Sequence, residues 1–99
     1  MLIGRVVGTV VSTQKEPRLA GLKFLVVRNL GLVGQEAAGF VVAVDMVGAG
    51  TGEVVLYVRG SSARQSTLTD QRPVDAAIMA IVDSWDIGGD VVFDKSKEA

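Results

Sequence analysis

The side chains most often used for nucleophilic and general-base catalysis are missing from this sequence. Cysteine and histidine are both absent from its 99 residues. Without them, thiol nucleophiles, disulfides and thiolate or imidazole metal sites cannot form. The commonest general acid–base group is missing as well. Several kinds of catalytic chemistry are therefore excluded at once.

A pair of serines in Gly60-Ser61-Ser62-Ala63-Arg64 is the first candidate for catalytic chemistry. A serine nucleophile needs a base, and only a lysine or a carboxylate could serve here. Neither serine of this segment lies three residues before a lysine, so the spacing of a serine–lysine pair is missing. We interpret the segment as a turn whose hydroxyls bind local backbone, with Arg64 free to pair with a carboxylate.

The segment Gly48-Ala49-Gly50-Thr51-Gly52 is the second candidate, because glycine-rich loops can hold a phosphate. Such loops bind phosphate when a helix N-terminus follows, whereas residues 53–58 have the pattern of a strand. We therefore expect a structural loop that lets two backbones come close, around an axis. A bulky side chain at Gly50 is expected to disrupt folding or assembly, because close approach or a positive φ is predicted there.

Four aspartates near the C-terminus could bind magnesium or perform acid–base work, and they are Asp83, Asp86, Asp90 and Asp94. Their spacing matches no metal-binding loop, and solvated acids commonly line the ends of hairpins. We therefore assign no catalytic residue and no metal site, and we expect no cofactor. A small enzyme that uses carboxylates alone is a rival interpretation without a defensible set of residues.

The charge balance is unfavourable for nucleic-acid binding. Ten basic and eleven acidic residues give a net charge of −1, and the pI is near 5.2. Nucleic-acid binding normally needs concentrated positive charge. Trp85 and Tyr57 could stack on bases, but no basic stripe surrounds them. No signal peptide or membrane span is expected, so a cytoplasmic location is the default.

The candidate residues described above have to be positioned by secondary structure. We predict four strands in the first two thirds of the chain, over residues 1–13, 21–30, 40–47 and 53–59. In the first strand, Gly4 and Gly8 share one face with Val6 and Val10. Glycines inside a strand usually mark coiling, a bulge or a close backbone approach. The second and fourth strands are apolar on both faces, which one half-buried sheet does not require. Such excess apolar surface must face solvent or a partner.

The last third of the chain is ambiguous between helix and strand. Pro73 and Asp75 resemble a helix start, so we predict a short helix over residues 73–79. The pair Gly88-Gly89 is typical of a tight hairpin turn, which predicts strands over residues 80–87 and 90–94. Residues 60–72 form the longest expected loop, and the tail 95–99 is expected to be frayed.

These elements predict an all-β, mainly antiparallel fold that forms one domain over residues 1–99. The best match is a small five-stranded barrel of the oligonucleotide-binding (OB) type, with one short helix and a C-terminal hairpin. Charge is uneven along the chain: residues 1–64 hold seven basic and four acidic side chains, and residues 65–99 hold three and seven. This asymmetry is either random scatter or a sign of head-to-tail packing in a ring.

Five stretches of the chain resemble, in order, the pentameric vertex proteins of bacterial microcompartments. They are Gly4–Lys15, Gly21–Val27, Asp45–Leu56, Gly60–Arg64 and Arg72–Ala77. This family includes carboxysome and ethanolamine-utilisation shell members. The resemblance spans about residues 1–94, and residues 65–71 look like the family's variable loop.

The resemblance implies a non-enzymatic shell protein that forms a homopentamer at the vertices of a cytoplasmic microcompartment. Its other partners would be hexamer-forming facet proteins, with no nucleic acid and no membrane. An OB-type nucleic-acid-binding module is the alternative function. The candidates for an oligomer interface or an axial loop are Gly48, Ala49, Gly50, Gly52, Ser61, Ser62 and Arg64.

Overall fold

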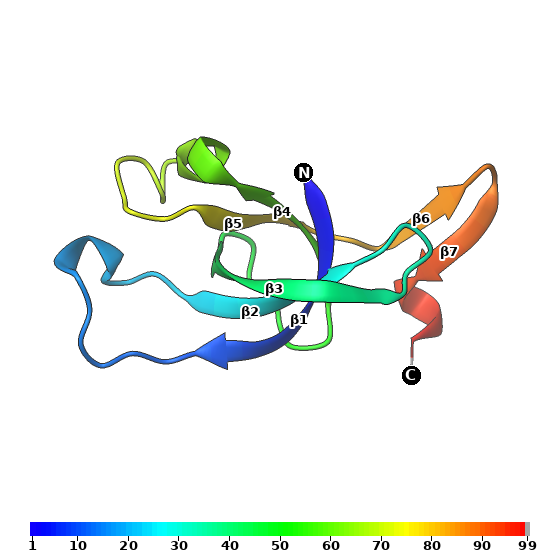
Figure 1. Ribbon diagram of the computed structural model, residues 1–99, viewed down its shortest axis with the longest axis horizontal. Coiled ribbons are helices and arrows are strands. Elements are labelled where there is room, and N and C mark those ends of the chain that lie inside the picture. The colour runs from blue at the N-terminus through cyan, green and yellow to red at the C-terminus, as the bar shows by residue number, and fades with distance from the viewer. Residues whose placement is uncertain (99) are drawn as a thin grey trace.

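The computed structural model describes residues 1–98, and five of its strands close into a barrel (Figure 1). The strands are β1 (Leu2–Val10), β2 (Phe24–Leu30), β3 (Glu36–Asp45), β4 (Val54–Arg59) and β5 (Ala76–Ile81). Around the barrel they follow the order β1-β2-β3-β5-β4, and only the β3–β5 pair is parallel. The prediction of a small, mainly antiparallel β-barrel is confirmed.

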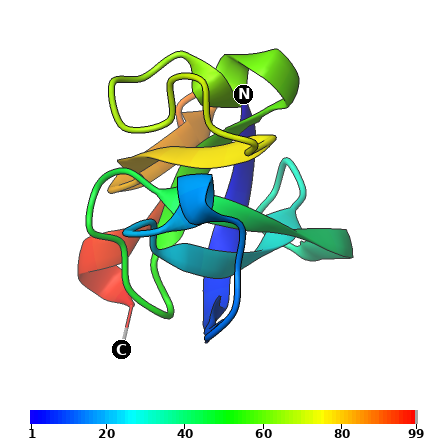
Figure 2. The same ribbon diagram turned by 90° about the vertical axis from the view of Figure 1, so that its left-hand side faces the viewer.

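The remaining elements lie at the two ends of an elongated molecule of 45 × 24 × 23 Å. The hairpin of β6 (Ser84–Ile87) and β7 (Asp90–Asp94) projects at one end, together with the short 3₁₀ turn η3 (Lys95–Lys97). The 3₁₀ turns η1 (Pro17–Leu19) and η2 (Gly60–Arg64) lie at the other end, which faces the viewer in Figure 2. Within residues 1–98 there is no helix with the length and apolar character needed to cross a membrane.

The barrel interior is filled by the inward side of each strand. The fully buried side chains include Val6, Leu25, Val27, Val55, Tyr57 and Ile78. A smaller apolar cluster of Leu22, Val44 and Val74 closes the outer side of β2 and β3 near η1. Alternation along the strands leaves the residues between these buried positions on the barrel exterior.

A bulge in β1 changes which residues share a face. Val6 pairs with Val27 of β2, but Gly8 pairs with Val26, so the register shifts between them. The expectation that Val6 and Val10 share a face is therefore wrong: Val6 is fully buried and Val10 is 38% exposed. The glycines did mark a bulge and a close approach. A Cβ at Gly4 would lie 2.8 Å from the carbonyl oxygen of Arg28 and against the side chain of Val27.

The helix predicted over residues 73–79 does not form. Residues Ala76–Ile81 are strand β5, which closes the barrel between β3 and β4. The first three residues of β5 (Ala76, Ala77 and Ile78) are all buried, so both faces of the strand are covered at its start. Its apolar residues therefore run without alternation and imitate helical spacing. The predicted strand over 80–87 is accordingly divided between the end of β5 and β6. The helical turn that follows the fourth strand is instead the 3₁₀ turn η2, directly after β4.

Three further boundaries differ from the sequence prediction. β3 begins at Glu36, four residues earlier than predicted, so Gly39 lies inside the strand with a φ of 89°. β3 also ends at Asp45, two residues earlier than predicted. Residues Lys95–Lys97 form the turn η3, while Ala99 of the expected frayed tail lies outside the described residues. The variable character of residues 65–71 stays a prediction.

Candidate functional site

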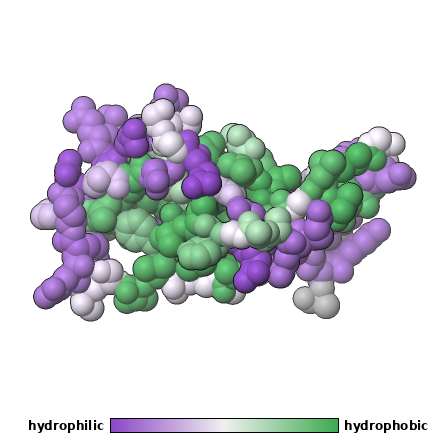
Figure 3. Space-filling model, viewed as in Figure 1, coloured by the Kyte–Doolittle hydropathy of each residue, from purple (hydrophilic) through white to green (hydrophobic). Residues whose placement is uncertain are grey.

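The first candidate surface lies across the outer sides of β1, β2 and β3. We call it the β1–β2–β3 flank, and it consists of Val10, Val26, Phe40 and Val42. Val26 pairs with Gly8 of β1 and with Val42 of β3, so these positions form one row across three strands. Phe40 is 66% exposed and Val42 is 42% exposed. Figure 3 shows apolar side chains along the middle of the molecule, over β2 and β3.

The second candidate surface lies on a different side of the barrel. We call it the β1–β4–β5 flank, and it consists of Ile3, Leu56, Val58 and Ala80. Ile3 pairs with Leu56, and Leu56 pairs with Ala80, so a second apolar row crosses three strands. All four residues are half-buried. The barrel order places β2 on one side of β1 and β4 on the other, which separates the two flanks.

Two unlike apolar flanks on one small barrel favour a ring. A single self-complementary patch would give a two-fold dimer, whereas two different patches that fit each other give head-to-tail contacts. Such contacts close into a ring when the rotation between neighbours is right. The sequence predicted this surface in part, since strands apolar on both faces indicated excess apolar area.

The glycine-rich loop between β3 and β4 is held from within by Asp45. The Oδ1 atom of Asp45 accepts hydrogen bonds from the backbone N–H groups of Val47, Gly48 and Ala49, at 3.0, 3.1 and 3.2 Å. Oδ2 of the same carboxylate lies 3.7 Å from the Lys23 ammonium, and the Asp45 side chain is only 3% exposed. The amides that a phosphate would need are therefore already bound to a carboxylate.

Glu53 and Arg5 hold the far end of the same loop. Oε1 of Glu53 accepts a hydrogen bond from the Gly50 N–H at 2.8 Å, and Oε2 pairs with the Lys95 ammonium at 2.6 Å. Arg5 donates to the Gly52 carbonyl at 2.8 Å. Hydrogen bonding by Lys95 first, then by the Gly50 amide, lowers the pKa of Glu53. Two carboxylates at this loop oppose anion binding, which supports its structural interpretation.

Within one chain, Gly50 has neither the positive φ nor the close backbone approach that the sequence predicted for it. Its φ is not in the left-handed region, and an added Cβ would lie 3.6 Å from Glu53 Oε1, an ordinary contact. The glycines that need their conformation are Gly48 and Gly52, with φ values of 77° and 93°. Whether Gly48, Ala49, Gly50 and Gly52 face a neighbouring subunit stays a prediction.

The serine segment forms the 3₁₀ turn η2, with Ser61 and Ser62 exposed. Arg64 donates to the Val74 carbonyl at 3.1 Å, so it braces the following loop and does not pair with a carboxylate as expected. This turn lies at the opposite end of β4 from the glycine-rich loop, about 20 Å away along a six-residue strand. The structure therefore does not bring the two candidate segments together within one chain.

Two of the four candidate aspartates and both candidate aromatic residues make contacts within the chain. Asp86 accepts a hydrogen bond from the Gly89 N–H at 3.1 Å, and Asp94 accepts bonds from Ser96. Among residues 1–98 no group of three acidic side chains has the geometry of a metal site. Trp85 stacks on Phe93 with ring centroids 5.4 Å apart and donates to the Leu32 carbonyl. Tyr57 is fully buried, with its hydroxyl on Asn29.

Comparison with known proteins identifies what this barrel is similar to. The family model described as "Ethanolamine utilisation protein EutN/carboxysome" matches residues 1–83. The chain belongs to this EutN/CcmL family.

Relatives of the chain are named for one structural role. The carboxysome shell vertex protein CcmL of Synechococcus elongatus is 50% identical over 99 residues, covering all of both chains. The solved structure of Gloeobacter violaceus CcmL covers 98% of this chain and 100% of that chain, with 45% identity and a TM-score of 0.95. The GrpN pentameric microcompartment shell protein from Rhodospirillum rubrum covers 88% and 100%, with 46% identity and a TM-score of 0.80.

Sequence reasoning missed the residues that hold the glycine-rich loop. Asp45 was recognised only as part of a family-like stretch, although an aspartate just before a turn commonly accepts hydrogen bonds from the following amides. That local signal could have identified it. The ion pair of Glu53 with Lys95 joins residues 42 positions apart, and no local pattern reveals such a pair.

Proposed function

We propose that five copies of this chain form a closed ring, and that the ring caps the vertices of a bacterial microcompartment shell. Its neighbours in the shell are hexamer-forming facet proteins, and its role is structural and not enzymatic. The observation that carries the proposal is similarity over the full length of the chain to carboxysome shell vertex proteins. The structure of one of them matches this barrel with a TM-score of 0.95.

The two flanks give this assembly a physical basis. The β1–β2–β3 flank of one subunit packs against the β1–β4–β5 flank of the next, which removes both apolar surfaces from water. The pentameric structure of GrpN supports five as the number at which the ring closes. A flat hexagonal facet cannot close on itself without five-fold positions, so a pentagonal unit completes the shell.

Counting the copies tests the ring directly. Native mass spectrometry of the purified protein should give one species of five subunits, held together in dilute solution. A monomer would contradict the ring, and a six-membered ring would contradict the vertex geometry.

The vertex role is tested in cells. Deleting the gene should leave facets but produce leaky or elongated shells, with the enclosed enzymes still active. Closed, regular shells in a strain that lacks every vertex protein would contradict the proposal.

The alternative function, nucleic-acid binding, was suggested by two aromatic residues that are already engaged within the chain. Tyr57 is inside the barrel, and Trp85 is engaged between the hairpin and the loop before β3. We expect no gel shift with single-stranded oligonucleotides at low salt, where electrostatic binding would be strongest. A salt-dependent shift at micromolar protein concentration would favour the alternative.

A further inference from the structure

Phe40 is the one aromatic residue among residues 1–98 whose side chain is largely exposed. Its exposed fraction is 66%, whereas the other four aromatic residues are buried or half-buried. Phe40 lies on the β1–β2–β3 flank, two residues before Val42 and on the same side of β3. Aromatic residues are enriched among the side chains that carry most of the binding energy of protein interfaces. Phe40 is therefore the residue of this flank that gains most from a partner.

A bulge in β3 sets the direction of Phe40. β3 carries three residues, 37–39, opposite the single residue Asn29 of β2. The last of the three, Gly39, has a φ of 89°, which residues with a Cβ rarely adopt, and it directly precedes Phe40. Bulges re-aim the side chains next to them. The orientation of Phe40 is therefore built into β3 and does not depend on a partner.

Hydrogen bonds of Asn29 fasten this bulge to the barrel interior. The Nδ2 atom of Asn29 donates to the Ala38 carbonyl at 3.2 Å, and its Oδ1 atom accepts a hydrogen bond from the hydroxyl of the fully buried Tyr57. A Cβ at Gly39 would lie 3.2 Å from the same Nδ2 atom, so the bulge packs closely on the amide. Tyr57 and Asn29 are therefore positioning residues for Phe40.

The β1–β4–β5 flank offers a seat for an aromatic side chain at Ala80. In the row of Ile3, Leu56 and Ala80, the first two side chains are large and branched, whereas the third is a single methyl group. Ala80 is half-buried, so part of it faces outward. β3 does not continue beside this part of β5, because the pairing of the two strands ends at Asp45 and Ile78. The row therefore steps down from Leu56 to a shallow apolar seat at Ala80.

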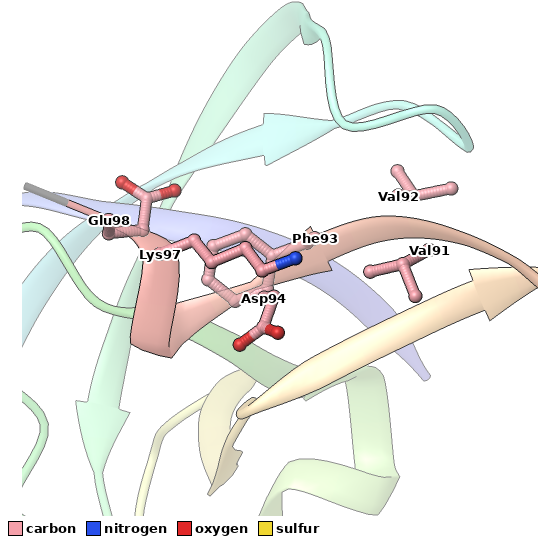
Figure 4. A pocket seen from close by; sticks show the side chains of 6 residues that line it. All are labelled: Val91, Val92, Phe93, Asp94, Lys97 and Glu98. Carbon is pink, nitrogen blue, oxygen red and sulfur yellow. The ribbon is translucent and has the colours of Figure 1, made fainter.

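The hollow beside β7 is less suited to an aromatic side chain. It has a volume of about 300 Å³ and lies between β7 and η3, where charged side chains stand among the apolar ones (Figure 4), namely Asp94, Lys97 and Glu98. Glu98 already pairs with Arg5 at 3.3 Å. An apolar side chain placed there would remove charged groups from water without giving them new partners. The row that contains Ala80 has no charged member.

We propose that Phe40 is the anchor of each contact in the ring, and that it seats on Ala80 of the next subunit. The inference rests on the proposed function, because it assigns a contact between neighbours in the ring of five. Head-to-tail packing lays the β1–β2–β3 flank of one copy on the β1–β4–β5 flank of the next, so the large exposed side chain of one flank meets the smallest side chain of the other. The pentameric structure of GrpN supports a second copy of the chain as the occupant of the seat.

Exchanging the sizes of the two side chains tests the contact. Phe40→Ala removes the phenyl group, Ala80→Phe fills the seat, and a double variant carries both changes. Leu32→Ala is the matched control, because Leu32 is 74% exposed and lies on the loop before β3, outside both flanks. Native mass spectrometry over a dilution series measures the concentration at which the ring dissociates. Circular dichroism checks that each variant is folded.

We expect Phe40→Ala to raise the dissociation concentration of the ring at least roughly tenfold, and Leu32→Ala to leave it unchanged. Ala80→Phe should weaken the ring as well, because two bulky side chains would meet at one place. The double variant should form rings more stable than those of either single variant, since the phenyl group is again opposite a methyl group. Ala80→Val repeats the comparison with a smaller side chain if Ala80→Phe does not fold.

Tyr57→Phe tests whether the bulge positions Phe40. This substitution keeps the aromatic group in the core and removes only the hydroxyl that binds Asn29. It should weaken the ring of the otherwise wild-type chain, but it should not weaken the ring of Phe40→Ala any further, because Tyr57 acts through Phe40. A role of Tyr57 in subunit stability alone would give the same change in both backgrounds.

Other results overturn the inference. A wild-type dissociation concentration in folded Phe40→Ala refutes the anchor, and a double variant no more stable than the single variants refutes the seat at Ala80. An equal effect of Tyr57→Phe in both backgrounds refutes the positioning of Phe40. These three results leave the ring of five intact, whereas a wild-type chain that forms no ring refutes the proposed function itself.

Discussion

At the scale of single residues, one buried carboxylate shapes the loop that joins β3 to β4. Asp45 ends β3 and binds three successive backbone amides, which turns the chain sharply away from the sheet. A buried carboxylate would normally be costly, but here three N–H groups and the Lys23 ammonium compensate for lost hydration. Hydrogen bonds from Asp45 and Glu53 therefore hold this loop in spite of its three glycines.

Replacing Asp45 should destabilise the protein because it leaves these amides without an acceptor. We expect Asp45→Ala to lower the free energy of unfolding by about 1–3 kcal/mol, and Asp45→Asn to lower it less because one amide oxygen remains. Urea denaturation measures both. Asp70→Asn, which changes an exposed side chain, is the control and should differ little from the wild type. Equal stability of Asp45→Ala and the control would show that the loop does not depend on this carboxylate.

The glycines of this loop should differ in their tolerance to substitution. Gly52 has a φ of 93°, which a β-branched residue rarely adopts, so Gly52→Val should cost ~1–3 kcal/mol. Gly50 has no such constraint, and Gly50→Ala should change the stability of the folded subunit by less than about 0.5 kcal/mol. Denaturation curves of the two variants measure this difference in the free energy of unfolding. If Gly50→Ala folds normally but fails to form a ring, Gly50 faces a neighbour, as the sequence suggested.

At the scale of elements, the turn η3 fastens the C-terminus to the barrel through Glu53 and Lys95. The pKa of Glu53 is lowered in the folded protein, so the pairing adds stability above the usual value of 4.5 and loses it as the pH falls through the lower folded value. The pKa of Lys95 is raised, mainly by the hydrogen bond that its ammonium donates to Glu53, so its charge is present throughout this range. Acid should therefore loosen the junction between η3 and the glycine-rich loop.

Glu53→Gln should flatten the fall in stability between neutral pH and the acid side of the usual glutamate pKa. Chemical denaturation at a series of pH values measures the slope. Lys95→Met removes the other partner, and the double variant should show no additional flattening, because both substitutions remove one interaction. Additive effects of the two substitutions would mean that Glu53 and Lys95 act separately.

The elements also show where sequence patterns succeed and where they fail. The strands that became β2 and β4 were predicted because β-branched residues occupy both faces, and the hairpin was predicted because Gly88 and Gly89 leave only a tight turn. β5 was mistaken for a helix because its position between two strands is set by pairing with residues 17 to 33 positions away. The bulge in β1 likewise depends on pairing with β2, so the sequence of β1 alone does not reveal which side Val10 faces.

At the scale of the whole molecule, the barrel supplies two apolar flanks on different sides. In the proposed ring the two flanks are different surfaces that pack against each other, so neighbouring copies meet head to tail. In such an arrangement every subunit uses both flanks. A substitution that damages one flank is present in every subunit of the variant, so it weakens every contact of the ring. A two-fold arrangement would behave differently, because each flank would pair with itself.

Two single variants distinguish these arrangements. Val42→Asp places a charge on the β1–β2–β3 flank, and Leu56→Asp places one on the β1–β4–β5 flank. If the contacts are head to tail, each purified variant should be a folded monomer in native mass spectrometry, because every contact contains one damaged flank. Mixing them should then produce heterodimers and no rings, since only the intact β1–β2–β3 flank of Leu56→Asp can meet the intact β1–β4–β5 flank of Val42→Asp. Circular dichroism confirms that the monomers are folded. Homodimers of either variant alone would instead indicate flanks that pair with themselves, and such pairing cannot close a five-membered ring.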